Sequence, residues 1–238
     1  MGEQIDRRAR KKAQTRELIR DVAQNLFDER GYEAVTIAEI ARAADVAVQT
    51  VFNHFATKEE LFFDGRTPWV DGPAEAVRSR PPSVAPLTAL RGHLVDNVAE
   101  LVASHRCPDR RRYIAALDAS DALRAHQLEL VHESELKLRQ ALLDAWAADG
   151  SVSPADPASA ASVIAAIWVA ASRSLVKTQR PLLIDGADPD VVAAGAMDMA
   201  QRVLRQLELG ANAVHGRASL VGAPRVDTGW PQDVRRAG

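Results

Sequence analysis

Cysteine is almost absent from this 238-residue sequence, with Cys107 as its single example. One cysteine excludes an intramolecular disulfide, and a chain without disulfides is typical of the reducing cytoplasm, where we expect this protein. Tyrosine and phenylalanine are also scarce, at two and five residues. Because alanine dominates instead, the composition favours helices over sheets.

Long apolar runs and targeting signals are missing as well. The longest apolar run, residues 158–171, contains serines and is too short to span a bilayer. The N-terminus is charged and has no apolar signal core. With 47% hydrophobic and 26% charged residues, the sequence predicts a soluble protein with a real core and no membrane contact.

Signatures of catalysis and of metal binding are absent too. The sequence has no phosphate-binding glycine loop, no G-x-S-x-G, no His-Glu-x-x-His and no cysteine pair. His126 and His132 fall on one expected helix with Glu133 and Glu135, but six residues separate the histidines rather than the four of a same-face zinc pair. We therefore expect no catalytic residue, no metal and no cofactor, and a metal site on this helix is the less favoured alternative.

Residues 36–61 hold the most regular pattern in the chain. Thr36 and Glu39 have the spacing of a capping box, in which both side chains satisfy free backbone N–H groups at a helix start. An apolar stripe at i, i+3 and i+4 follows and stops after two turns. A second stripe comes next, and then a second capping box at Thr57 and Glu60. A short helix, a tight turn and another short helix indicate a helix-turn-helix unit.

The second helix of such a unit is the one that can enter a DNA major groove. Its apolar stripe consists of Val48, Val51, Phe52 and Phe55. Its solvent side carries short hydrogen-bonding side chains and a valine that can touch a thymine methyl, namely Val48, Gln49, Thr50, Asn53 and His54. The alternative is a compact three-helix core with an ordinary polar face, because helix-turn-helix patterns produce many false positives.

The motifs of this stretch are Thr36, Ile40-Ala41, Ala44-Asp45-Val46-Ala47, Thr50-Val51-Phe52-Asn53-His54-Phe55 and Lys58-Glu59-Glu60-Leu61. They resemble the DNA-binding domain of the TetR (tetracycline-repressor-like) family of bacterial regulators, whose pattern is Thr, Ile-Ala, Ala-Gly-Val-Ser, Thr-x-Tyr-x-His-Phe and Lys-Glu-x-Leu. The resemblance covers about residues 12–65, and residues 26–32 look like the end of the family's first helix.

Three positions depart from the family pattern. Asp45 replaces the turn glycine, which is tolerable because aspartate visits positive φ more readily than most residues. Ala47 replaces the serine that would cap the second helix, so we expect Asp45 or water to cap it instead. Phe52 replaces a tyrosine whose hydroxyl usually reaches a phosphate in the family, so phosphate anchoring there is expected to be weaker.

The resemblance implies that residues 48–54 read bases or adjoining phosphate, while Thr36 and Lys58 clamp the DNA backbone. The net charge of the whole chain is only −2, but residues 7–20 carry seven basic side chains against Glu17, a local charge of +6. This arm is therefore expected to supply most of the phosphate attraction. The expected DNA-contacting residues are Arg10, Lys12, Arg16, Thr36, Val48, Gln49, Thr50, Phe52, Asn53, His54 and Lys58.

Helical periodicity extends through the rest of the chain, and we expect an all-α fold of about nine helices. Residues 8–30 form the first helix, and the expected core of the first domain is Leu26, Phe27, Val35, Ile40, Val46, Val51 and Phe55. Pro68 and Gly72 predict a kink or an early stop with a short second piece. The expected segments are a basic arm and helix-turn-helix domain at 1–66, a linker or helix extension at 67–86, a C-terminal effector-binding and dimerisation domain at 87–209 and a flexible tail at 210–238.

Two helices near the C-terminus are candidates for a dimer interface. Asp-Pro pairs predict their starts, and they should span residues 157–180 and 189–209. The first is apolar nearly all round and must be covered on most sides. We expect the pair to form a four-helix bundle across a homodimer. The alternative is a central helix buried inside one monomer.

The resemblance further implies a small-molecule effector bound among the C-terminal helices. The expected lining is Leu90, Leu94, Val98, Leu101, Tyr113, Leu117, Leu128, Val131, Trp146 and Trp168, with His126, His132 and Arg173 as polar handles. For each of these residues the alternative is plain core. A mainly apolar lining favours a lipophilic or acyl-type effector.

The function predicted from the sequence is a ligand-responsive transcriptional repressor that binds a palindromic operator in double-stranded DNA as a homodimer. Effector binding would tilt the fourth helix and release the DNA. The alternative is a helical small-molecule-binding or adaptor protein that has lost DNA binding, which Phe52, Ala47 and the weak net charge favour. An enzyme ranks third.

Overall fold

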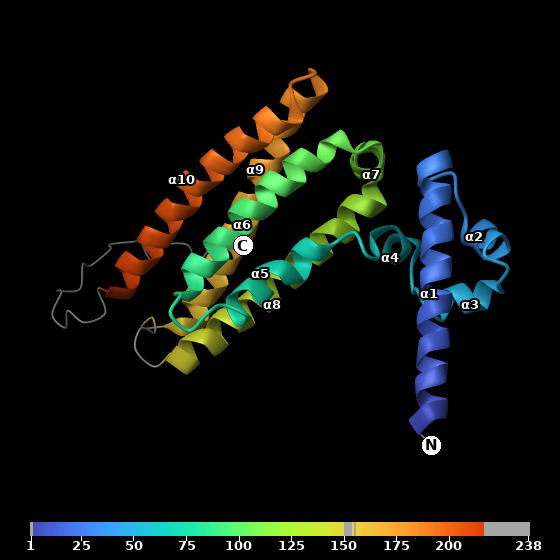
Figure 1. Cartoon of the computed structure of the whole chain (residues 1–238), viewed down its shortest axis with the longest axis horizontal. Helices are drawn as coiled ribbons and strands as arrows, with labels where there is room; N and C mark the ends of the chain where they lie inside the picture. Colours follow the sequence, from blue (N-terminus) through green and yellow to red (C-terminus); the bar gives the residue numbers. More distant parts are fainter. Residues whose placement is uncertain (1, 150–153, 155, 217–238) are drawn as a thin grey trace, which may run out of the picture.

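The computed structural model of the chain describes residues 2–149, 154 and 156–216, and those residues form helices and connecting loops without any strand (Figure 1). The prediction of an all-α fold is confirmed, with ten α-helices and one 3-10 helix in the described residues. They are α1 (Gly2–Arg30), α2 (Ile37–Ala43), α3 (Val48–Phe52), α4 (Lys58–Phe63), α5 (Pro68–Arg78), α6 (Pro86–Ala103), η1 (Ser104–Arg106), α7 (Pro108–Ala119), α8 (Asp121–Asp149), α9 (Pro157–Ile184) and α10 (Pro189–Gly216).

Helix ends differ from the expected ones. α1 begins at Gly2 rather than near residue 8, because the basic arm contains no breaker after that glycine. α9 and α10 continue past residues 180 and 209 to Ile184 and Gly216. Part of the expected tail, residues 210–216, therefore belongs to α10, and the remainder lies outside the described residues.

α1 to α4 enclose a small apolar core at the N-terminal end of the molecule. Gly31 ends α1 with a φ of +83°, and its N–H donates to the Phe27 carbonyl at 2.9 Å. The buried side chains from this part of the chain are Ile19, Ala23, Phe27, Tyr32, Val35, Ile40, Ala41, Ala44, Val51, Phe55, Leu61, Phe62 and Phe63. Of the seven core residues predicted from the sequence, five are in that set, and Leu26 and Val46 are partly buried at its edge.

The segment after α4 follows the expected alternative of an early stop with a short second piece, because α4 ends at Phe63 and α5 covers Pro68–Arg78. Pro68 opens α5 as its first residue, and the helix continues through Gly72 and Pro73. Because proline has no N–H, the Trp69 carbonyl four residues earlier loses its helical donor. The Ser134 hydroxyl of α8 donates to that carbonyl instead, at 3.4 Å.

Gly72 explains how α5 fits against α6. A Cβ at this position would lie 2.6 Å from Nε2 of His93 on α6, so any larger residue would require the His93 ring to shift. Ala74 and Val77 of α5 are fully buried in the C-terminal core. Thus α5, which lies inside the expected linker segment 67–86, packs as part of the C-terminal domain.

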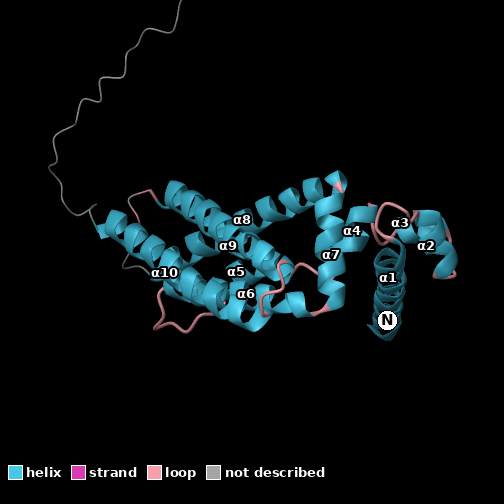
Figure 2. Cartoon of the chain, turned by 90° about the horizontal axis from the view of Figure 1, so that it is seen from above, coloured by secondary structure: helices cyan, strands magenta, loops and turns pink. Residues whose placement is uncertain are grey.

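The C-terminal domain is a bundle of long helices. α6 packs against α10, α5 against α8, and α9 contacts both α8 and α10. Figures 1 and 2 show these helices running side by side, with the α1–α4 domain at one end of the bundle beside α7. The core between them is built from aliphatic residues and from Trp146 and Trp168.

Helix α9 is more apolar than its neighbours. By length and composition alone its segment Pro157–Leu183 could cross a membrane, which corrects the expectation that this apolar run is too short. The apolar window is 39% buried inside the protein, and a core helix of a soluble protein passes the same test. The finding is therefore weak evidence for a membrane span.

α7 and the start of α8 join the two domains. Tyr113, Ile114, Leu117 and Leu123 are buried in the same cluster as the core of the α1–α4 domain. The Tyr113 ring stacks on Phe62 of α4, with ring centroids 5.0 Å apart and 10° between the ring planes. α7 and α4 are therefore in direct contact at the junction of the two domains.

Candidate nucleic-acid interface and C-terminal cavity

The capping box that starts α2 is present. The Thr36 hydroxyl accepts from the Glu39 N–H at 3.3 Å, and the Glu39 carboxylate accepts from the Thr36 N–H at 2.9 Å. A hydrogen bond from Arg30 and these Thr36 donors lower the pKa of Glu39 to about 2. The box is consequently ionised at any physiological pH.

The cap of α4 is related but not reciprocal. The Thr57 hydroxyl accepts from the Glu60 N–H at 3.1 Å, as predicted. The Glu60 carboxylate, however, accepts from the N–H of Ala56 at 2.7 Å rather than from that of Thr57. The return bond thus moves one residue back along the chain.

The turn between α2 and α3 is the tight one that the sequence predicts. Asp45 has a φ of +52° and is the one non-glycine residue with positive φ among the residues described. Ala47 precedes α3 without any side-chain cap, so the expectation that Asp45 caps this helix is wrong. The aspartate shapes the turn and does not bond to the first N–H groups of α3.

α3 buries one face and exposes the other. Val51 is fully buried, whereas the side chains of Val48 and Phe52 are 42% and 46% exposed. The apolar stripe predicted across α3 is therefore wrong at these two positions, which lie on the solvent side. Gln49 and Asn53 are exposed beside them, and the Gln49 amide donates to the Asn53 side-chain oxygen at 3.2 Å.

His54 follows α3 and is half-buried. Burial, together with the positive charges of Lys12 and Arg16, lowers the pKa of His54 below 6.5, so its ring is neutral at neutral pH. The Arg16 guanidinium donates to the His54 carbonyl at 2.5 Å and to the Asp64 carboxylate at 2.6 Å, and it lies 4.0 Å from the Phe55 ring centroid. Arg16 thus ties the end of α3 and the end of α4 to α1.

Lys58 is similarly occupied inside the domain. Its ammonium donates to the carbonyls of Tyr32 and Val35 at 3.0 Å and 3.1 Å, and it lies 4.0 Å from the Tyr32 ring centroid. The Tyr32 hydroxyl in turn donates to Glu59 at 2.6 Å. Lys58 therefore satisfies two carbonyls of the loop between α1 and α2.

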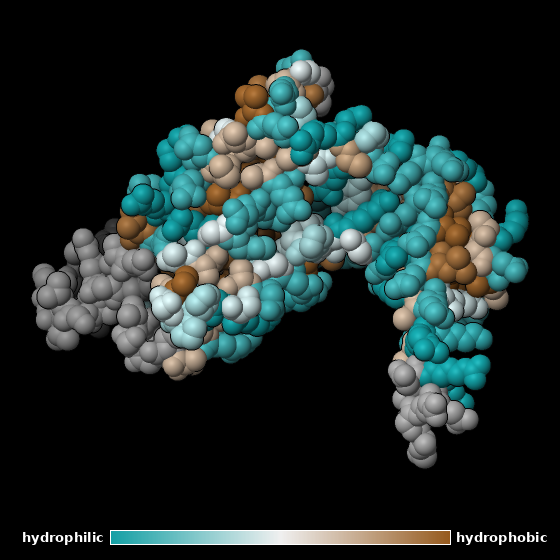
Figure 3. Space-filling view, viewed as in Figure 1, coloured by the Kyte–Doolittle hydropathy of each residue, from teal (hydrophilic) through white to brown (hydrophobic). Residues whose placement is uncertain are grey.

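The first part of the basic arm, residues 7–12, differs from Arg16 and Lys58 because its basic side chains are not engaged within the described part of the domain. α1 extends well beyond α3 (Figure 1), and teal, hydrophilic residues lie next to the grey tip of this helix in the space-filling view (Figure 3). Five exposed basic side chains there form no ion pair with any residue that the structure describes: Arg7, Arg8, Arg10, Lys11 and Lys12. They lie on the domain that also exposes the polar face of α3, so both can face one duplex.

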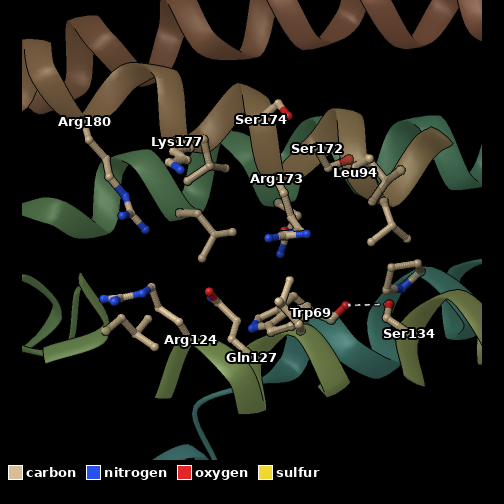
Figure 4. Close-up of a pocket in the computed structure, with 18 of the residues that line it drawn as sticks. Trp69, Leu94, Arg124, Gln127, Ser134, Ser172, Arg173, Ser174, Lys177 and Arg180 are labelled. Atoms are coloured by element: carbon tan, nitrogen blue, oxygen red, sulfur yellow. Dashed lines mark hydrogen bonds between the residues drawn. The ribbon is translucent and has the colours of Figure 1, made fainter. Parts of the chain in front are cut away.

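A cavity with a volume of 440 Å³ lies in the C-terminal domain. Arg173 of α9 points into it toward Trp69 of α5 (Figure 4), and Lys177 of α9 and Gln127 of α8 also line it. Five of the residues expected in an effector pocket line it: Leu94, Leu101, Leu117, Leu128 and Arg173.

The other residues expected in the pocket lie elsewhere. Tyr113 and His126 belong to the domain junction, where Tyr113 stacks on Phe62 and His126 lies 5.2 Å from Phe63 between ring centroids. The remaining ones do not line the cavity, and all but the exposed His132 are buried in the bundle core: Leu90, Val98, Val131, His132, Trp146 and Trp168.

Sequence reasoning missed most of the polar lining of the cavity. The missed residues are Asn97, Arg110, Asp118, Arg124, Gln127, Ser134, Ser172, Ser174, Lys177 and Arg180. A signal was available for part of this set, because Arg173, Lys177 and Arg180 repeat at i, i+4 and i+7 on an otherwise apolar helix. The cations from α7 and α8 carried no comparable signal.

These features define a two-domain helix-turn-helix protein, with a basic arm, an exposed second helix and a helical domain that encloses a cavity. Residues 19–64 match the family model of the bacterial regulatory proteins of the tetR family. The match covers the C-terminal part of α1 together with α2, α3 and α4.

One similar sequence and two solved structures with a similar fold were also found. HTH-type transcriptional regulator TcmR of Streptomyces glaucescens is 36% identical over 85 residues, which cover 36% of this chain and 38% of that protein. The chain thus spans well under half the length of this relative. GusR of Salmonella enterica has the same fold, with a TM-score of 0.50 at 17% identity over 85% of this chain and 95% of that one. A TetR-family regulator of Streptomyces coelicolor A3 gives a TM-score of 0.50 at 20% identity over 81% and 96%.

Proposed function

We propose that this protein is a cytoplasmic DNA-binding transcriptional regulator, and specifically a repressor that a small molecule releases from its operator. The observation that carries the proposal is the exposed polar face of α3 beside the exposed basic side chains of residues 7–12, which have no carboxylate partners in the described residues. A related protein named as a helix-turn-helix transcriptional regulator supports it.

The exposed residues divide by chemistry into base readers and phosphate ligands. Gln49 and Asn53 carry amides, which can pair bidentately with adenine, and Val48 can contact a thymine methyl. The arm supplies sequence-independent attraction to phosphates, to which Arg10 and Lys12 contribute. Thr36, Thr50, Phe52 and His54 complete the proposed interface at its edges.

Arg16 and Lys58 take a different part in the proposal. Both side chains already bond to carbonyl groups of the same domain. Their main contribution is to hold α3 and the loop after α1 in place. Their loss would therefore weaken DNA binding because α3 would no longer be held in the orientation that fits the major groove. Any contact with phosphate is secondary for these two residues.

A homodimer through α9 and α10 would pair two such readers. These helices expose large apolar side chains, among them Val163 and Ile167 of α9 and Met199 and Val203 of α10. White, tan and brown residues are interspersed with hydrophilic ones along α10 in Figure 3. Burying this surface against a second copy would form a four-helix bundle. It would also place two readers about 34–36 Å apart, the spacing of half-sites one turn apart in B-DNA.

The junction between α7 and α4 supports a route for the signal. A ligand in the cavity would act on α7, because Leu117 lines the cavity while Tyr113 of the same helix stacks on Phe62. Movement of α4 would then change the spacing of the two readers. Binding to DNA and binding to the ligand would thus be coupled reciprocally.

Fluorescence anisotropy on labelled DNA from upstream of the protein's own gene tests the function, with a scrambled duplex as competitor. We expect salt-dependent binding that prefers the upstream DNA. Asn53→Ala should lose this preference at particular base pairs, whereas Lys12→Ala should weaken binding to both duplexes alike. Absence of binding even at low salt would instead favour the alternative of a ligand-binding or adaptor protein.

A further inference from the structure

The cavity in the C-terminal domain is much more basic than a site for a purely lipophilic effector. Five cationic side chains line it, and Asp118 is the single carboxylate in the lining. The cations come from three helices and are Arg110 of α7, Arg124 of α8 and Arg173, Lys177 and Arg180 of α9. The expectation of few polar groups in the lining therefore does not hold for this cavity.

Two of these cations are neutralised within the protein. Arg180 donates to both carboxylate oxygens of Asp118, at 2.9 Å and 3.1 Å. Arg124 pairs with Asp121 and donates to the Asp118 carbonyl. The remaining three, Arg110, Arg173 and Lys177, have no hydrogen bond or ion pair with any described residue. The cavity therefore holds an excess of uncompensated positive charge.

Of these three residues, Arg110 gives the strongest indication that the cavity binds an anion. Its Nε is buried without a hydrogen-bond partner among the described residues, and so is the Nε of Arg180. The Arg110 guanidinium lies 4.7 Å from the Tyr113 ring centroid, which offers a π face but no carboxylate. Leaving a buried N–H donor of a guanidinium without an acceptor is unfavourable, because the group stays charged. An anion that enters from outside would supply the missing acceptors.

The rest of the lining sets the shape of such an anion. Trp69, Leu94, Leu101, Leu128 and Val169 form apolar walls around the polar groups. In Figure 4, Arg173 reaches toward Trp69 across the cavity, so a charged and an aromatic surface face one volume. At 440 Å³ the cavity is within the usual range of about 300–1,000 Å³ for small-molecule sites.

We propose that this cavity binds an amphipathic organic carboxylate, with its headgroup against Arg110, Arg173 and Lys177 and its aromatic or alicyclic body against Trp69 and the leucines. A planar carboxylate matches the paired donors of a guanidinium. The inference rests on the proposed function only in calling this molecule the effector. The binding itself does not require DNA.

Arg110 also connects the site to the reading domain. The Tyr113 ring that it faces is the ring that stacks on Phe62 of α4. A carboxylate that draws Arg110 into the cavity would remove a cation from that ring and so alter the packing of α7 on α4. The effect of ligand binding would therefore pass to α4 through α7 alone.

Binding of pyrenebutyrate to the full-length protein, compared with its uncharged analogue pyrenebutanol, tests the proposal by pyrene fluorescence anisotropy. The two probes share the aromatic body and differ in the carboxylate. We expect the carboxylate to bind at least about tenfold more tightly, since hydrogen bonds to charged groups are worth roughly tenfold to a hundredfold each. Arg110→Gln should lose most of that preference while leaving the affinity for pyrenebutanol unchanged.

Arg112→Gln is the matched control, because Arg112 is exposed on the same helix, pairs with Asp109 and does not line the cavity. If Arg110→Gln fails to fold by circular dichroism, the double variant Arg173→Gln/Lys177→Gln replaces it in the test. Both of these lining residues are exposed, so their substitution should not affect folding. Equal affinities for the two probes, or equal losses in the control, would overturn the proposal. Both results concern ligand binding and say nothing against the proposed DNA binding. Conversely, a protein that fails to bind DNA could still bind the carboxylate probe more tightly than the alcohol.

Discussion

Replacing Lys58 by methionine separates two explanations of why a lysine stands at the start of α4. The resemblance to the TetR family implies a clamp on the DNA backbone, whereas in the structure the ammonium bonds to the carbonyls of Tyr32 and Val35. Methionine keeps most of the aliphatic stem and removes only the charge and its donors. The variant therefore reports on those bonds and little else.

The expected cost follows from the contacts that are lost. Two hydrogen bonds from a charged donor, at 3.0 Å and 3.1 Å, are worth about 1.5–3 kcal/mol each when buried, and the contact with the Tyr32 ring adds about 0.5–1 kcal/mol. Lys58 is only half-buried, so water replaces part of this. We expect Lys58→Met to lower the free energy of unfolding by about 2–3 kcal/mol.

Urea denaturation followed by far-UV circular dichroism measures this loss, and a salt titration of DNA binding measures the phosphate contacts. Lys12→Met is the control, because Lys12 is exposed and unpaired with any described residue. It should leave stability unchanged and reduce the salt slope by about 0.9, the value of one phosphate contact. If Lys58→Met instead behaves like this control, with a stability loss under about 0.5 kcal/mol, Lys58 does not stabilise the domain through its bonds to the two carbonyls.

Three further predictions concern other parts of the molecule. Arg16→Met should cost about 1–2 kcal/mol by urea denaturation, since its bonds are charge-assisted but partly screened by solvent. Burial lowers the pKa of His105 below the usual 6.5, so the unfolded chain takes up its proton first as the pH falls. Stability should therefore be full above pH 6.5 and decline below it, and His105→Gln should flatten that decline in thermal melts at graded pH. Ile167→Glu together with Val203→Glu should give a monomer in analytical ultracentrifugation, and a variant that stays dimeric would place the interface elsewhere.

Much of the N-terminal domain follows from local rules. The Thr36 capping box, the positive φ of Asp45 and the glycine that ends α1 each depend on a few neighbouring residues, so spacing alone predicts them. The apolar stripe predicted for α3 depends on more distant contacts, and the exposed Phe52 shows where prediction from spacing fails. Only the position of the domain core relative to α3 decides that this ring faces solvent.

The features that sequence could not predict depend on contacts between distant residues. α5 continues through Pro73 because Ser134, on another helix, bonds to the carbonyl that the proline leaves free. Arg16 seemed free to bind phosphate because its partner Asp64 is 48 residues away. The charge of the cavity likewise arises where α7, α8 and α9 converge.

The central claim is that two copies of this chain present a pair of α3 helices to one duplex. Sequencing the fragments that the purified protein retains from random DNA, with the mass of the complex measured in solution, tests it most directly. We predict an inverted repeat whose half-site centres lie about 10–10.5 base pairs apart or at a multiple of that spacing, with at least two chains bound. Retention of unrelated fragments, or of one chain on a single unrepeated site, would contradict it.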